Sequence, residues 1–155
     1  MSDLLTIRDK VTRYTTRVFS DVQIDEDGDL AVPLGSTRIY VRVTETTDPE
    51  VVAYRNEHNL YKFIVHSYAV VLYGVEPSEE FFKWIAVEGS NYWLGNFKAV
   101  KQQDKDVYNL IFEASIVADE LDETELRSVL WAIASTADGD DEELQQKFGG
   151  KRARE

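Results

Sequence analysis

The sequence predicts an α+β domain, in which an antiparallel β-sheet carries helices on one face. Two observations lead to this prediction. Apolar residues recur at three- and four-residue spacing in some segments, which indicates amphipathic helices, and they alternate with polar residues in others, which indicates strands. The expected order is α-β-β-β-α-β-β-α. Because helices and strands do not alternate one to one along the chain, a parallel α/β sheet is not expected.

The first helix is expected over residues 3–18, with Ser2 or Asp3 as its N-cap. A hairpin should follow at Asp27-Gly28, because glycine tolerates the positive φ angles of a tight turn. Alternating apolar residues at 39, 41 and 43 then predict a half-buried strand. Beyond the break at residues 48–49 we expect a strand over residues 51–54 and a polar turn over residues 55–59.

Residues 61–73 form a long segment rich in β-branched and aromatic residues, which predicts a strand. Both of its faces are largely apolar. Two explanations remain open at this point: a central strand covered on both sides, or a strand whose outer face binds something.

The C-terminal half begins with a helix capped by Ser78 and ended by Gly89. Strands are expected over residues 92–100 and 107–117. The last helix starts at the capping box formed by Asp122 and Glu125, and Gly139 should break it before a short helix over residues 142–148. We expect residues 1–148 to form a single domain and residues 149–155 to form a disordered tail.

The composition favours a protein partner. The 155-residue chain has 29 acidic and 17 basic residues, a net charge of −12, which repels nucleic acids and anionic membrane surfaces. Basic or mixed-charge polypeptides are the natural partners of such a surface, although the charge could also serve only solubility. The absence of cysteine excludes disulfides, and neither a signal peptide nor a membrane-spanning segment is evident. We therefore expect a cytoplasmic protein.

No catalytic or metal-binding pattern stands out. Asp25, Asp27 and Asp29 are spaced like the start of a calcium loop, but the glycine falls inside the cluster and Ser36 occupies the position of the final carboxylate. His66 is interpreted as a histidine of the sheet, since no nucleophile or acid is placed near it. We expect no enzyme, no cofactor and no metal ion, with a pair of catalytic carboxylates as the remaining alternative.

The sheet face turned away from the helices is the candidate binding surface. If residues 39, 41 and 43 point toward the helices, their neighbours and part of the long strand point the other way. This face would mix aromatic, aliphatic and charged side chains, which suits a polypeptide ligand or a dimer partner. The alternative is a wet face with scattered apolar residues. The predicted peptide-binding residues are Tyr40, Arg42, His66, Tyr68 and Ile111.

Several segments resemble one known superfamily. Residues 77–86 and 91–95 resemble the second helix and the following strand of the YbjN-like and type III secretion chaperone-like (CesT-type) superfamily. Residues 121–126, 137–138 and 147–150 resemble the terminal helix of its actinobacterial branch. The resemblance extends from about Gly28 to Gly150 and carries over no functional residue.

This resemblance implies a domain of helix, three strands, helix, two strands and helix. It also implies a small, acidic, cytoplasmic homodimer that holds an extended segment of a client protein and has no enzymatic activity. We therefore expect a non-enzymatic protein-binding module. The alternatives are a regulatory or scaffolding homodimer without a client and a carboxylate-based hydrolase.

Overall fold

The computed structural model describes residues 3–153, and Ser2, one of the two expected N-caps, lies outside them. This part of the chain forms four helices, α1 (Leu4–Val18), α2 (Pro49–His58), α3 (Glu79–Val87) and α4 (Glu123–Phe148). Its strands are β1 (Gln23–Ile24), β2 (Leu30–Leu34), β3 (Thr37–Glu45), β4 (Phe63–Val75), β5 (Asn96–Lys101), β6 (Tyr108–Val117) and β7 (Lys151–Arg152). No helix within this range has the length and apolar character that a bilayer crossing requires.

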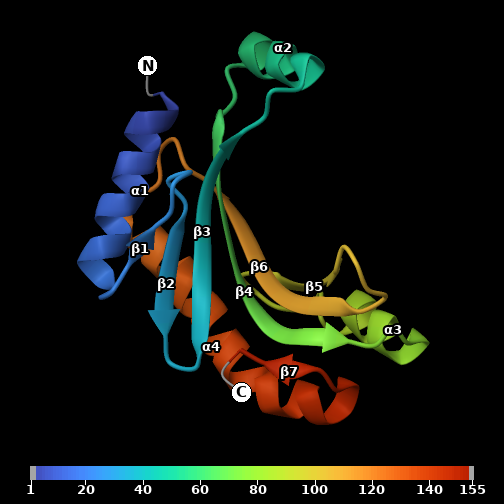
Figure 1. Cartoon of the computed structure of the whole chain (residues 1–155). Coiled ribbons are helices and arrows are strands. Elements are labelled where there is room, and N and C mark those ends of the chain that lie inside the picture. Colours follow the sequence, from blue (N-terminus) through green and yellow to red (C-terminus); the bar gives the residue numbers. More distant parts are fainter. Residues whose placement is uncertain (1–2, 154–155) are drawn as a thin grey trace.

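The strands form one antiparallel sheet in the order β1-β2-β3-β4-β6-β5, and β7 pairs with the end of β4. Helices α1 and α4 pack on one face of this sheet (Figure 1). The core lies between these two helices and the sheet, where side chains such as Val11, Val41, Val65 and Ile133 are buried. The predicted α+β fold, with an antiparallel sheet and helices on one face, is confirmed.

Strand β4 is apolar on both faces for two reasons: Ile64, Tyr68 and Val70 point away from the helices, and a β-bulge interrupts the alternation beyond them. Before the bulge, alternate residues point toward the helices and away from them. The pairing with β6 then skips from Val70–Ile111 to Leu72–Leu110, so Val71 and Leu72 are both buried on the helix side. A bulge bends its strand, and β4 and β6 curve so that the face without α1 and α4 is the inner side of the bend (Figure 1).

Local capping chemistry sets the start of three helices where the sequence predicts it. The Asp3 carboxylate accepts a hydrogen bond from the Thr6 N–H at 2.8 Å. Ser78 accepts one from the N–H of Phe81 at 3.1 Å. Helix α4 begins with the complete capping box, in which side chain and backbone are bonded reciprocally between Asp122 and the third helical residue.

Helix α2 replaces the strand expected over residues 51–54 and the turn expected over residues 55–59, so that prediction is wrong. The Asp48 carboxylate caps the helix by accepting hydrogen bonds from the N–H groups of Glu50 and Val51. Pro49 occupies the first turn, where its missing N–H costs nothing. Asn59 ends the helix in the left-handed conformation, with a φ angle of 52°. The N-cap Asp48 and the first-turn proline therefore outweigh the strand preference of Val51 and Val52.

Two further differences lie in the C-terminal part. Helix α4 continues through Gly139, where a break was expected, because Ala137 and Leu144 lie on one buried stripe on either side of it. Strand β5 begins only at Asn96, because residues 92–95 form a tight turn closed by an isolated bridge.

Strand β7 lies where the disordered tail was expected to begin. Lys151 pairs with Tyr73, and Arg152 with Leu72. Gly150 permits this pairing: its φ angle is +80°, and a Cβ atom there would lie 2.7 Å from the carbonyl oxygen of Tyr73. Residues 151–152 are therefore part of the sheet.

Candidate functional site

The sheet face opposite α1 and α4 is the candidate functional site, and we call it the open face. It is the inner side of the bend and lies between α2 and α3 (Figure 1). Because directly paired residues of neighbouring strands point to the same side, the pairing register assigns its members. The open face includes Tyr40, Arg42, Thr44, Ile64, His66, Tyr68, Val70, Asn96, Lys98, Ile111, Glu113 and Ser115.

Stacked rings occupy the centre of the open face. Tyr40 of β3 and Tyr68 of β4 are cross-strand partners, and their ring centroids lie 5.1 Å apart at an interplanar angle of 23°. His66 stacks on Tyr68 with a centroid distance of 5.6 Å. None of the three is among the side chains packed against the core. The rings therefore form a half-buried platform with a separate position on the outer side of the sheet.

Ion pairs border this platform on two sides. The Arg42 Nε donates a hydrogen bond of 2.6 Å to the Oδ2 of Asp29. On the other side, the His66 Nε2 lies 2.7 Å from the Oε2 of Glu113, and the Lys98 Nζ lies 3.7 Å from the other carboxylate oxygen. Each of these basic side chains therefore lies against a carboxylate at the border of the platform.

The ionisation of the central residues follows from their surroundings. Burial against the sheet raises the pKa of Tyr68, so its hydroxyl stays protonated at neutral pH. The hydrogen bond to Asp29 raises the pKa of Arg42, which stays cationic. The open face therefore offers hydroxyl donors and ring surfaces. Within residues 3–153, no group of three or more His, Asp and Glu side chains is placed to hold a metal ion.

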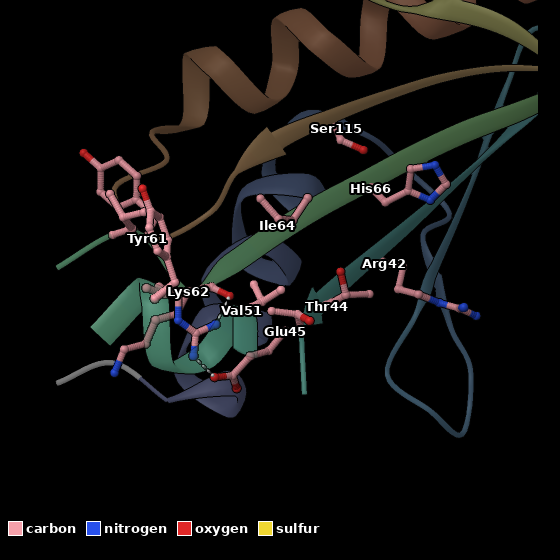
Figure 2. A pocket seen from close by; sticks show the side chains of 13 residues that line it. Arg42, Thr44, Glu45, Val51, Tyr61, Lys62, Ile64, His66 and Ser115 are labelled. Atoms are coloured by element: carbon pink, nitrogen blue, oxygen red, sulfur yellow. Dashed lines mark hydrogen bonds and ion pairs between the residues drawn. The ribbon is translucent and has the colours of Figure 1, made fainter. Parts of the chain in front are cut away.

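A groove extends the open face toward α2 (Figure 2). It has a volume of about 660 Å³. Its floor is made by Arg42, Thr44, Ile64, His66 and Ser115 of the open face. Its wall is formed by α2 and the segment that follows this helix. The residues of this wall are Val51, Tyr54, Arg55, Leu60, Tyr61 and Lys62. We call this cavity the α2 groove.

The structure brings four of the five predicted site residues into one cluster. Tyr40, Arg42, His66 and Tyr68 lie on two adjacent strands at directly paired positions. Ile111 shares their face but pairs with Val70 farther along β4, and it is only 7% exposed.

The apolar wall of the α2 groove was not predicted. The sequence predicts a strand and a turn over residues 51–59, and this prediction hides the side chains that α2 places beside β4. The sequence signal that could have revealed them is Asp48-Pro49, an N-cap followed by a proline in the first helical turn.

The fold and the uncovered, ring-lined face define the class: a small α+β domain with one sheet face left free by its helices. A family model described as "T3SS (YopN, CesT) and YbjN peptide-binding chaperone 1" matches residues 63–155, more than half of the 155-residue chain. The chain belongs to this family of peptide-binding chaperones. The predicted superfamily is thereby confirmed, whereas the actinobacterial branch stays a prediction.

Several solved chains are similar to this one. A chain of the ExsC–ExsE complex is 15% identical with a TM-score of 0.58, over 92% of this chain and 96% of that one. The Yersinia pestis type III secretion chaperone SycH, solved in complex with a stable fragment of YscM2, is 12% identical with a TM-score of 0.50, over 86% of this chain and 98% of that one. Such similarity establishes the fold. No curated protein matches the chain.

Proposed function

We propose that this protein is a non-enzymatic chaperone that holds an extended segment of a client polypeptide against its open face. The carrying observation is the stacked platform of Tyr40, Tyr68 and His66, which stands outside the core on a face left free by α1 and α4. Tyrosine rings bury a large area with little loss of side-chain freedom, and their hydroxyls can still donate hydrogen bonds. Membership of a peptide-binding family supports this proposal.

An extended client has two ways to bind. It can lie across the open face, where its side chains cover the rings, or it can add a strand to the free edge of β5, which pairs only with β6 among the described strands. The net charge of −12 favours a client segment that carries lysine or arginine. The same charge disfavours nucleic acids and anionic membranes, and we propose a cytoplasmic location.

A second copy of this chain is the proposed partner for another surface. Trp93, in the turn before β5, is 94% exposed. It borders an apolar cavity of about 480 Å³ that is also lined by Leu94, Val117 and Leu121. An exposed tryptophan beside an apolar cavity is typical of an interface, and we propose a homodimer formed there. Trp93→Ser should convert the dimer to monomer in sedimentation velocity, whereas Trp131→Ser should not, because Trp131 packs on Phe19 within its own chain.

The proposed function is tested with a phage-displayed library of random peptides, selected on the full-length protein. We expect enriched peptides that bind the wild type and bind Tyr40→Ser at least tenfold more weakly. Tyr14→Ser is the matched control, since Tyr14 is also half-buried but packs against the core on the opposite face. Equal effects of both substitutions would contradict the proposal. A stable dimer that enriches no peptide would instead favour the regulatory or scaffolding alternative.

A further inference from the structure

The wall of the α2 groove is an unusual concentration of exposed apolar side chains. Five large apolar side chains that line it are between 38% and 59% exposed: Val51, Tyr54, Leu60, Tyr61 and Ile64. Figure 2 shows Val51, Tyr61 and Ile64 around the groove, with the side chains of Thr44 and Glu45 on its β3 side. None of the five belongs to the core. Contiguous apolar surface of this kind marks an interaction site.

The groove is held in shape by polar contacts. Arg55 of α2 is buried, and its Nη2 lies 3.1 Å from the Oε1 of Glu45 on β3. The carboxylate of Asp119 accepts hydrogen bonds from the N–H groups of Lys62 and Phe63 at 3.0 and 2.9 Å. The Tyr61 hydroxyl donates to Glu120 at 3.0 Å. A preformed groove binds without the entropy cost of ordering its walls.

The charge around the groove indicates which side chains accompany an apolar anchor. The basic side chains of its lining are Arg42, Arg55, Lys62 and His66, and carboxylates of Asp29, Glu45 and Glu113 lie against Arg42, Arg55 and His66. Acidic side chains outnumber them nearby: α2 carries Glu50 and Glu57 and is capped by Asp48, while Glu45 lines the groove and Glu120 follows β6. This excess of negative charge complements a positively charged segment.

We propose that the α2 groove binds one large apolar side chain of the client segment, with a lysine or arginine next to it in the client. This inference rests on the proposed function, since it identifies the kind of client segment that the open face holds. Arg42 and His66 line the groove and also belong to the open face, so the two surfaces are continuous. Ile64 and Tyr68 are four positions apart along β4, a distance of about 13 Å at the rise of an extended strand. A client stretch of about five extended residues therefore reaches both the groove and the ring platform.

The test uses the full-length protein and the peptides selected from the random phage library, made synthetically. We expect them to share a Leu, Ile, Phe or Trp next to a Lys or Arg. Leu60→Ser should weaken their binding at least tenfold, whereas Leu5→Ser should not, because Leu5 is an exposed leucine on α1 outside the groove. Replacing the apolar anchor of the peptide by serine should weaken binding to the wild type and have little further effect on Leu60→Ser.

A second pair of variants guards against a folding defect. Val51→Ser removes an apolar side chain of the groove, and Val87→Ser removes a similarly exposed valine from α3. Only Val51→Ser should weaken binding, with the circular dichroism spectrum unchanged in both.

Four results would overturn the inference. Loss of binding in Tyr40→Ser but not in Leu60→Ser or Val51→Ser would refute the groove while leaving the proposed function intact. Enriched peptides without an apolar residue next to a basic one would refute the recognition rule. Conversion of a dimer to monomer by Leu60→Ser would show that a second copy occupies the groove. A selection that enriches no peptide refutes the inference together with the proposed function.

Discussion

Replacing Arg55 by methionine should detach α2 from the sheet while the rest of the domain stays folded. Arg55 is the only residue of α2 that is buried, and within residues 3–153 the core includes no side chain from this helix. The attachment of α2 to the sheet therefore depends on the polar contacts of the guanidinium group. Methionine keeps much of the aliphatic stem and removes only the charge and the donors.

The contacts themselves set the magnitude. A hydrogen bond to a charged group contributes about 1.5–3 kcal/mol, and the bond from Arg55 to Glu45 is of this kind, at 3.1 Å. The bond to the carbonyl of Lys62 is long, at 3.4 Å, and adds little. The Glu45 side chain is 34% exposed, so water screens the pair. The Arg55 Nε is buried without a hydrogen-bond partner in the described part of the chain, a cost that methionine removes. We expect a net loss of about 1–2 kcal/mol.

Hydrogen exchange followed by mass spectrometry measures this loss locally. A change of 1–2 kcal/mol corresponds to about 5- to 30-fold faster exchange of the α2 amides. The amides of α4 should exchange as in the wild type. Arg17→Met is the matched control, because Arg17 and Glu123 form a solvent-exposed pair at 3.6 Å that contributes little. Unchanged exchange in α2, or equal acceleration in α4, would refute the claim that Arg55 fastens this helix.

Further predictions concern the ends of α4 and the turn before β5. Asp122→Ala removes the capping box and should lower the free energy of unfolding by about 1 kcal/mol in urea titrations. Gly150→Ala should abolish the amide protection of β7, because its Cβ would meet the β4 backbone at 2.7 Å, whereas Gly139→Ala, which meets no atom within 4 Å, should stabilise α4 by about 1 kcal/mol. Burial and the hydrogen bond to Asp140 raise the pKa of Tyr92 to about 12, above the usual value of about 10. Between these pH values the folded state retains a proton that the unfolded state loses. The contribution of Tyr92 to the free energy of unfolding is therefore fully present below about pH 10 and declines toward pH 12. Tyr92→Phe should flatten this decline in urea titrations.

Features set by neighbouring residues could be predicted from the sequence. Asp3, Ser78 and Asp122 each bond backbone groups within the next three residues, so the start of their helices depends on local chemistry. The same holds for the open face. Successive residues of a strand point to opposite sides, so Tyr40 and Tyr68 lie on the side opposite their buried neighbours in β3 and β4.

Features that depend on distant contacts could not be predicted. Strand β7 forms only because the edge of β4 is free beyond the N-terminal end of its antiparallel neighbour β3. Nothing within the sequence of residues 149–155 indicates that edge. Helix α4 tolerates Gly139 because the sheet buries the stripe on either side of it. The α2 groove required both the helix and its position beside β4, so its residues could not be grouped before the structure was known.

The central claim is that the open face holds another polypeptide, and site-specific photocrosslinking tests it most directly. The photoreactive amino acid p-benzoylphenylalanine is placed at position 68 or, as a control, at position 14, and the full-length protein is irradiated in cells. Our account predicts a discrete covalent adduct with a different polypeptide from position 68 and none from position 14, since Tyr68 lies on the open face and Tyr14 packs against the core. Adducts formed equally at both positions, or only with a second copy of this chain, would contradict it.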